Sequence, residues 1–383
     1  MIHRLTLAAI AALLFVGAPA HGQVVFDNDS ADGTWENALN WSGDALPGAT
    51  DNVQIHSGFS ATLGSNQSVT DFTVASDGAG GTTGQVDHSA GTLSGAGTSW
   101  AKIGTDGAGN VGTYNMSGSA SLTNFDVFAL GIVGGDGTLN MGAGTSLSTN
   151  SGVAMGGIAT VNQTGGTFTS GAWLGLSNFG GGTVNYNISG GSVISNGDIF
   201  TVGEDGVGNL NVSGSANVEA NGIAMTIGRN GGSDGTLNVD GSGATISVND
   251  LLVDESGNSA TINWTADAGG ITQITSANGT RFGDNGILMV DLTGDADFAN
   301  FGTGTSSLEI TLIENVAGGV AGTFNGLAEG ASVDIGGGKT AILSYVGGDG
   351  NDITLTVQTI PEPGSMAVIA VGLGVAAFRR RRR

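Results

Sequence analysis

Two aspartates in a glycine-rich stretch near residue 350 are the clearest candidates for binding a ligand. Residues 347–355 have the sequence GGDGNDITL, which follows the glycine and aspartate positions of the calcium-binding nonapeptide GGxGxDxUx. Calcium prefers oxygen ligands and lies between consecutive turns of such repeats, so one copy supplies only part of a coordination shell. Asp349 and Asp352 are therefore candidate calcium ligands. We favour the alternative, a plain Gly-Asp turn, and predict no other metal site or cofactor.

No arrangement of side chains predicts a catalytic centre. Lyases that act on acidic sugars place Arg or Lys beside carboxylates, but residues 23–361 contain only four scattered basic residues. A glycosidase needs only two carboxylates about 5 to 10 Å apart, a condition that an acidic chain meets by chance. His56 and His88 have no evident Ser or Asp partners. We therefore expect no enzymatic activity and no catalytic residues.

The charge is distributed unevenly along the 383 residues. The whole chain has a formal net charge of −23, yet its last five residues are all arginine. Residues 23–361 contain 32 acidic residues and four basic ones, a net charge of −28; the basic residues are Lys102, Arg229, Arg281 and Lys339. Such a body should repel nucleic acid and anionic membranes and attract cations, although acidity for solubility alone is an alternative. The chain has no cysteine, which excludes disulfides and thiolate metal sites.

The first 22 residues predict a secretory signal peptide. Arg4 precedes an apolar core over residues 5–16, and small residues at 18, 20 and 22 form cleavage sites. This order is typical of export signals. A membrane anchor is the alternative, which the shortness of the apolar core disfavours.

A four-residue pattern recurs through the middle of the chain: a small residue, a variable residue, an apolar residue and Asn. The copies follow a weaker first one at residues 84–87 with spacings of 28, 25, 22, 23, 26, 27 and 25 residues. They are Gly112-Thr-Tyr-Asn115, Gly137-Thr-Leu-Asn140, Ala159-Thr-Val-Asn162, Gly182-Thr-Val-Asn185, Gly208-Asn-Leu-Asn211, Gly235-Thr-Leu-Asn238 and Ala260-Thr-Ile-Asn263. A period in this range predicts a stacked solenoid.

Each repeat contains three short apolar segments that are separated by glycine-rich turns. No amphipathic stretch is long enough for a reliable helix, and each unit is too small to bury an apolar face alone. We therefore predict an all-β fold: a parallel β-helix (β-solenoid) of about eight coils of 22–28 residues, with N- and C-terminal β caps. We divide the chain into a signal peptide (1–22), an N-terminal cap and first strands (23–83), the repeats (84–286) and a C-terminal β region (287–357).

The recurring Asn predicts a ladder. Asn side chains at equivalent positions of stacked coils can hydrogen-bond to one another along the axis, and we favour this structural role over ligand binding. We assign Asn185 to the ladder in its coil and expect its replacement by Ala to weaken stacking.

Trp35 and Trp41 allow two interpretations. Aromatic side chains can close the open end of a solenoid core, and an exposed pair can stack on a sugar ring. We favour the cap. The surrounding stretch, with its Pro-Gly at residues 47–48 and an Asp-Asn-Val strand start at 51–53, resembles the N-terminal segment of many secreted bacterial β-solenoids.

The last 24 residues, 360–383, combine three features in a fixed order. Pro361, Glu362 and Pro363 come first, an apolar run over 365–378 follows, and Arg379, Arg380, Arg381, Arg382 and Arg383 end the chain. The run is 14 residues long, whereas a comfortable membrane span needs about 20. The arginine cluster would stay on the cytoplasmic side of a membrane. A short tail anchor with a basic stop is the simplest interpretation.

These three features together resemble the PEP-CTERM sorting signal of Gram-negative bacteria. The resemblance implies that the tail is a transient transmembrane helix, recognised and removed by a membrane transpeptidase-like enzyme, exosortase. It further implies export, an inner-membrane intermediate, and then display at the cell surface or release. Residues 322–355 also resemble the end of autotransporter-type passenger solenoids.

From these patterns we expect an exported structural or adhesive β-solenoid, at the cell surface or in an extracellular matrix. Its expected partners are an exosortase-like enzyme, the membrane through its tail before processing, and exopolysaccharide or other envelope components; we expect no nucleic acid. The alternative is a secreted carbohydrate-active enzyme, a polysaccharide lyase or glycosidase, on the same fold.

Overall fold

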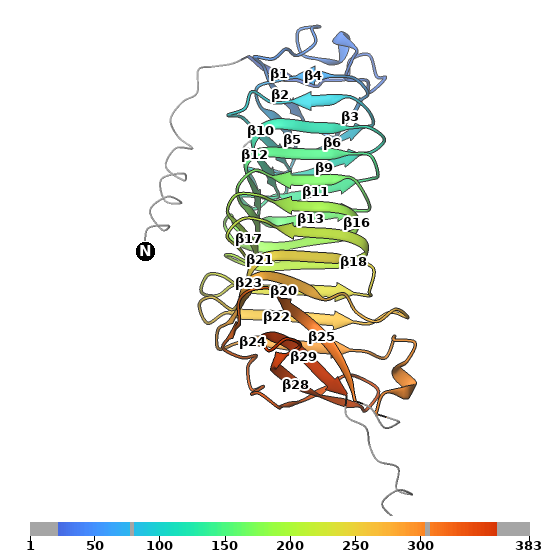
Figure 1. Ribbon diagram of the computed structural model, residues 1–383. Helices are drawn as coiled ribbons and strands as arrows, with labels where there is room; N and C mark the ends of the chain where they lie inside the picture. Colours follow the sequence, from blue (N-terminus) through green and yellow to red (C-terminus); the bar gives the residue numbers. More distant parts are fainter. Residues whose placement is uncertain (1–21, 77–79, 303–306, 358–383) are drawn as a thin grey trace, which may run out of the picture.

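The chain coils into a long rod whose strands stack as rungs from one end to the other (Figure 1). The structure is a computed structural model and describes residues 22–76, 80–302 and 307–357. Within these residues the coil makes about 11 turns. The sequence predicted the parallel β-solenoid and both caps correctly but gave only about eight coils, because strands on either side of the repeats take places in the same columns.

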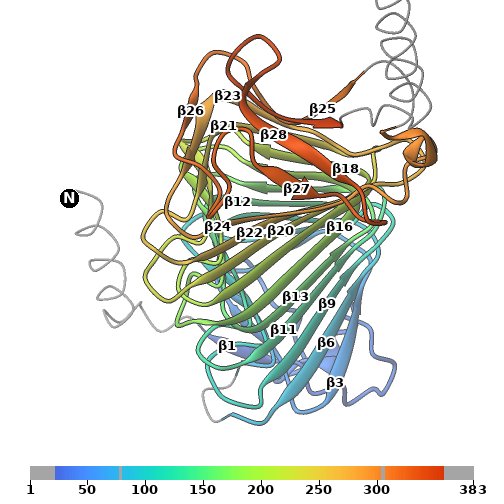
Figure 2. The ribbon, with the colours of Figure 1, turned by 90° about the horizontal axis from the view of Figure 1, so that it is seen from below.

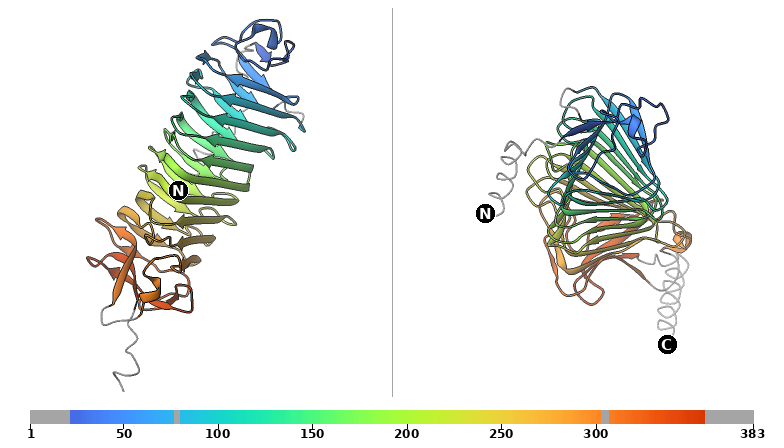
Figure 3. Two further views of the ribbon diagram at one scale, coloured as in Figure 1. Left: turned by 90° about the vertical axis from the view of Figure 1, so that its right-hand side faces the viewer. Right: turned by 90° about the horizontal axis from the view of Figure 1, so that it is seen from above.

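Three parallel sheets run along the rod, and each turn of the coil supplies one strand or half of a long strand to each sheet (Figure 3). The first sheet carries the recurring Asn pattern. Its strands, in order, are β3 (Phe59–Leu63), β6 (Thr83–His88), β9 (Val111–Met116), β11 (Asp136–Met141), β13 (Gly157–Gln163), β16 (Gly182–Ser195), β18 (Val207–Ala220), β20 (Asp234–Asp240), β22 (Ser259–Thr265) and β24 (Gly286–Asp291).

The second sheet follows the first across a tight turn, and in β16 and β18 a single strand continues around this corner into both sheets. Its other strands are β4 (Gln67–Ser68), β7 (Thr92–Ser94), β10 (Ser121–Leu130), β12 (Ser146–Met155), β14 (Thr167–Ser170), β21 (Thr245–Val253), β23 (Ile274–Phe282) and β25 (Leu308–Asn315).

The third sheet completes each turn, and the far halves of β10, β12, β21 and β23 belong to it. Its other strands are β1 (Gln23–Val25), β2 (Asn52–Ile55), β5 (Phe72–Val74), β8 (Trp100–Ile103), β15 (Leu174–Leu176), β17 (Ile199–Val202), β19 (Ala224–Ile227) and β26 (Val320–Ala321).

The main core is an apolar cluster that extends along the inside of the coil from Phe26 to Val357, and a small second cluster around Val127, Ala129 and Ala154 is separate from it. Side chains alternate along each strand, as in β11, where every second residue is buried; this period of two is the one that a half-buried strand requires. The small residue of the repeat pattern faces inward where the preceding turn comes close. A Cβ added at Gly208 would lie 2.2 Å from the backbone nitrogen of Gly203. In most coils, therefore, only the smallest side chains fit at this position of the pattern.

Both ends of the rod are covered. At the N-terminal end, a segment that includes the 3-10 helix η1 (Ala38–Asn40) places Trp35 and Trp41 over the first coil. At the C-terminal end, β27 (Ser332–Asp334), β28 (Thr340–Gly347) and β29 (Asp352–Val357) form an antiparallel cap that joins β25. Viewed from below, this cap lies across the stack of coils (Figure 2). A second 3-10 helix, η2 (Phe298–Asn300), precedes β25.

Candidate functional site

The outer surface of the first sheet carries a continuous ladder of amide side chains. In each rung the Nδ2 of one residue donates to a side-chain oxygen one turn earlier, over distances between 2.7 and 3.2 Å. The members, in order, are Asp87, Asn115, Asn140, Asn162, Asn187, Asn211, Asn238 and Asn263. The predicted ladder is therefore present.

All seven hydrogen bonds of the ladder run in the same direction, and its two ends differ. Asp87 occupies the first position, where the ladder needs only an acceptor, and a carboxylate can only accept. Its oxygens also accept hydrogen bonds from Gln85, both at 3.0 Å. At the other end Met289 stands opposite Asn263, so the ladder stops there.

One predicted member of the ladder was wrong. Asn185 fits the repeat pattern, but β13 and β16 pair with Gly157 opposite Gly182, so Asn187 lies opposite Asn162 and Asn185 opposite Thr160. The buried apolar place of the pattern is taken by Tyr186, whose hydroxyl donates to Gln163 over 2.6 Å. The sequence pattern alone could not reveal this shift of two residues, because both alignments keep the inside and outside faces.

A second outward column lies beside the ladder on the first sheet. Its members are hydroxyl and amide side chains, all partly buried: Gln85, Thr113, Thr138, Thr160, Asn185, Asn209, Thr236 and Thr261. We call this column and the ladder together the polar face. Apart from Asp87 the polar face has no ionisable group, so it can recognise a partner only by hydrogen bonding and shape.

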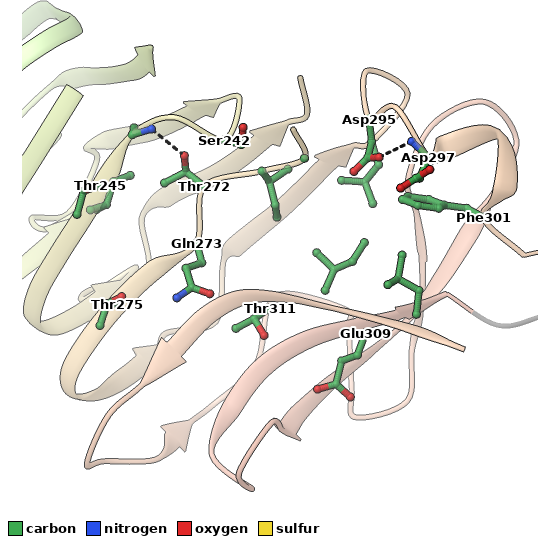
Figure 4. A pocket seen from close by; sticks show the side chains of 17 residues that line it. Ser242, Thr245, Thr272, Gln273, Thr275, Asp295, Asp297, Phe301, Glu309 and Thr311 are labelled. Carbon is green, nitrogen blue, oxygen red and sulfur yellow. Dashed lines mark hydrogen bonds between the residues drawn. The ribbon is translucent and has the colours of Figure 1, made fainter. Parts of the chain in front are cut away.

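A groove of about 640 Å³ opens where the last coil meets the C-terminal cap. The second-sheet strands β23 and β25 pair only from Ile274 and Ile313 onward, and the residues before these diverge to form its two long walls. The loop that contains Asp295, Asp297 and Phe301 closes the third side (Figure 4). The floor is apolar and includes Ile246, Leu292 and Ile310.

The groove contains the carboxylates of Asp295, Asp297 and Glu309. A glycoside-cleaving enzyme would need to use such groups. The Asp295 carboxylate accepts the backbone N–H of Asp297 over 2.7 Å, and Asp297 itself is exposed. Glu309 lies on the opposite wall but accepts a hydrogen bond from the backbone N–H of Gly348 over 3.2 Å, so one of its oxygens is engaged with the cap. The groove thus presents acidic groups above an apolar floor.

Lys339 fixes the loop that forms the third wall. Its ammonium group donates to the backbone carbonyls of Phe298 (2.6 Å), Ala299 (3.2 Å) and Phe301 (2.7 Å) and lies 4.8 Å from the centre of the Phe298 ring. A cation is favourable at the C-terminal end of a helical turn, where carbonyl oxygens lack partners. The groove wall is therefore held in place by the cap, a contact between distant residues that the sequence did not reveal.

Three charged residues in successive turns form an ion cluster that sequence reasoning missed. Arg229 Nη1 lies 2.8 Å from the buried Glu204 carboxylate, and its Nε lies 3.5 Å from Glu255. Burial raises the pKa of Glu204, and the Arg229 guanidinium and a hydrogen bond from Thr201 only partly offset this. Each of the three stands two positions after the apolar residue that ends a third-sheet strand, which was the available signal.

The two tryptophans and His88 have structural roles. Trp35 and Trp41 are fully buried, pack edge to face with centroids 4.7 Å apart, and are joined by a hydrogen bond from the Trp41 indole to the Trp35 carbonyl. The sugar-stacking interpretation is therefore wrong. His88 is also buried: Nδ1 lies 2.7 Å from the Tyr114 hydroxyl and Nε2 lies 3.1 Å from the Gly91 carbonyl.

The calcium-like stretch forms the turn of an antiparallel hairpin. β28 and β29 pair with Gly347 opposite Asp352, and Oδ1 of Asp352 accepts the backbone N–H of Asn315 over 2.9 Å. Thr354 occupies the position that the nonapeptide reserves for a large apolar residue. In the part of the chain that the structure describes, no three His, Cys, Asp or Glu side chains gather as a metal site. The preference for a plain Gly-Asp turn over calcium ligation by Asp349 and Asp352 stays a prediction.

The C-terminal tail matches a known sorting motif. A model of the PEP-CTERM protein-sorting motif matches residues 359–383. The chain carries a PEP-CTERM sorting motif. The match contains Pro361, Glu362, Pro363 and the arginines at 379–383, all of which lie outside the described residues, as do residues 1–21 of the predicted signal peptide. The PEP-CTERM motif implies export, processing by an exosortase-type enzyme, and sorting to the cell surface or beyond it.

Other comparisons add little to the PEP-CTERM assignment. No curated protein and no solved structure matched the chain significantly. The likeness to autotransporter passengers is a loose analogy of architecture. Among the described residues, no helix is both long enough and apolar enough to cross a membrane; the predicted tail helix at 365–378 lies outside them.

Proposed function

We propose that the exported protein is a structural or adhesive rod that acts outside the cell after its tail has been removed. The observation that carries this proposal is the attachment of the PEP-CTERM motif to a continuous, capped solenoid. A solenoid gains stability from contacts between neighbouring coils, so its length can grow without a larger core. Both caps cover strand edges that would otherwise template uncontrolled association.

The sorting half of the proposal is tested by following cellular location and mass. Replacing Pro361, Glu362 and Pro363 together by alanine should leave the tail attached and keep the protein at the membrane, whereas the parent loses the mass of the tail. Asp240→Asn, a change at an exposed position of the body, is the control and should be sorted normally. Unchanged location and mass in the triple variant would refute the proposed sorting.

The adhesive half of the proposal assigns contact with envelope polysaccharide to the polar face. Its hydroxyl and amide groups can exchange hydrogen bonds with sugar hydroxyls, and its lack of charge avoids the repulsion that the acidic body exerts on anionic polymers. Thr160→Glu should weaken sedimentation of the protein with exopolysaccharide prepared from its own cells. Thr169→Glu, at an outward and partly exposed position of the second sheet in the next strand of the same coil, should not. Equal effects would exclude the polar face as the contact.

A carbohydrate-active enzyme is the second candidate function, and the acidic groove is the observation that favours it. Two carboxylates above an apolar floor resemble the composition of a sugar-cleaving site. The test is release of reducing ends from polysaccharides by the parent and by Asp295→Asn and Asp297→Asn. Activity that either substitution abolishes would support the enzyme; activity that survives both would exclude the groove as its site.

A further inference from the structure

The groove lies next to the place where the sorting tail leaves the body. Leu308 and Val357 are paired across β25 and β29, and Leu308 is also a lining residue of the groove. Paired residues of antiparallel strands have Cα atoms about 5 Å apart. Val357 is the last described residue before the tail, so the tail begins beside the open end of the groove.

Chain length limits how far the sorting motif can be from the groove. Pro361 follows Val357 by four residues, and an extended chain spans at most about 3.5 Å per residue. The motif therefore lies within about 14 Å of Val357. A protein that binds a partner through a typical interface covers about 800 Å² of the partner's surface, the area of a disc about 16 Å in radius. An enzyme that recognises Pro361 with such a footprint therefore has the groove end of the cap within its reach.

The groove has the chemistry of a docking surface for a basic loop. Leu308 is an exposed apolar side chain at its mouth, with 44 % of its surface accessible, and the floor behind it is apolar. Asp295 and Asp297 stand on the rim. Among the described residues that line the groove none is basic, and the nearby Lys339 is directed to three backbone carbonyls.

We propose that this groove is the docking site of the exosortase-type processing enzyme, and that a basic loop bearing an apolar side chain fills it. The inference rests on the proposed sorting and adds a second recognition site on the folded body to the motif in the tail. The apolar contact holds the enzyme beside the tail, and the rim carboxylates attract its positive loop. Processing of the tail then depends on a folded C-terminal cap.

The test measures the rate of tail removal in cells by pulse labelling and mass. The variant Leu308→Gln with Asp297→Asn removes the exposed apolar side chain and one rim charge; Asp297 makes no side-chain capping hydrogen bond to η2, so folding should be retained. The matched control is Ile158→Gln with Asp240→Asn, an exposed apolar residue and an exposed carboxylate on the first sheet. We expect processing of the groove variant to be about tenfold slower, the effect of about 1.4 kcal/mol, and the control to match the parent.

A charge reversal separates docking from a folding defect. Asp297→Lys should slow processing further than Asp297→Asn, while all variants keep the melting temperature of the parent. If Leu308→Gln with Asp297→Asn and Asp297→Lys are both processed at the parental rate, the inference is overturned. A parent dimer in sedimentation that the groove variant loses, with processing unchanged, would overturn it in favour of a second copy as the occupant.

The same experiment distinguishes failure of this inference from failure of the proposed sorting. If tail removal requires Pro361, Glu362 and Pro363 but is indifferent to the groove, only the docking site is wrong. If the parent keeps its tail, or loses it equally well without the motif, the sorting proposal fails and the docking site fails with it.

Discussion

The side-chain amide of Asn187 donates a hydrogen bond to Oδ1 of Asn162, 2.9 Å away and one turn of the coil earlier. Asn187 in turn accepts one from Asn211 over 2.8 Å. Asn185, two positions earlier on the same strand and also facing outward, instead accepts a hydrogen bond from Asn209 over 3.0 Å. The two residues share residue type, strand and partial burial, but only Asn187 belongs to the ladder.

Asn187→Ala should destabilise the rod more than Asn185→Ala. The first substitution removes two ladder hydrogen bonds and leaves Asn162 and Asn211 without their partner, at a cost of about 1–2 kcal/mol. The second removes one bond outside the ladder. Thermal unfolding followed by circular dichroism compares the two variants directly. Equal melting temperatures would show that the ladder does not stabilise stacking.

Arg229→Met should destabilise the middle of the rod by about 3 kcal/mol at neutral pH, because it leaves the buried Glu204 carboxylate without its cation. The measurement is chemical denaturation, with amide hydrogen exchange of β17, β19 and β21 to locate the loss. Lys102→Met is the control, since it removes a more exposed ion pair with Asp106 and should cost well under 1 kcal/mol. A cost for Arg229→Met as small as that of the control would contradict a stabilising role for the ion cluster.

The defect of Arg229→Met should shrink on acidification. Burial raises the pKa of Glu204 above its ordinary value, so the folded state binds this proton at a higher pH than the unfolded chain does. The proton therefore increasingly favours the folded state as the pH falls from neutral towards 4.5, the ordinary pKa. Melting temperatures of the variant and the parent across this interval give the comparison. A difference in melting temperature between variant and parent that grows as the pH falls would refute the assigned role of Glu204.

His88 should make the rod less stable below about pH 6.5. Burial lowers the pKa of His88 from its ordinary 6.5, so the unfolded chain takes up the proton first, and stability present above pH 6.5 is lost as the pH falls through the folded-state pKa. His88→Gln should flatten the melting temperature between pH 7.5 and 5 relative to the parent. The matched control is His56→Gln, which removes an imidazole that bonds Ser57 at an exposed site; a flattening as large as that of His88→Gln would contradict the role assigned to His88.

Trp41→Ala should open the N-terminal end of the coil. The buried indole packs between Phe26 and Trp35, and loss of a buried Trp costs about 3–5 kcal/mol. Because a solenoid is stabilised mainly by neighbouring coils, hydrogen exchange should accelerate in β1 and β2 and remain slow in β18 and β20. Uniform acceleration along the whole rod would indicate that the end is not an independent cap.

Calcium should not change the stability of the C-terminal hairpin. Asp352 already accepts the backbone N–H of Asn315, and the antiparallel hairpin does not stack two copies of the nonapeptide. Calorimetric titration of the mature protein with millimolar calcium should give no heat of binding. A binding signal that Asp349→Asn removes would instead establish the calcium site.

Inside the repeats, the sequence predicted most of the first sheet. The small residue, the buried apolar residue and the outward Asn of each copy occupy the expected places in every coil except that of Asn187. The prediction failed for that coil because residues 182–185 fit the pattern by chance. In the structure, Val184 takes the place of the small residue. A shift of two residues preserves the inside–outside alternation of a strand, so local sequence contains no signal against it.

The sequence by itself determined the sorting motif, the all-β class and the stacking of coils, because each of these depends on composition, period or a contiguous motif. Only the tertiary structure decided the register of Asn187, the Glu204–Arg229–Glu255 cluster, the burial of Trp35 and Trp41, and the groove beside Leu308. These features arise from contacts between residues that lie from six residues to several coils apart in the chain. Such contacts are fixed by the packing of all coils together, which no single repeat encodes.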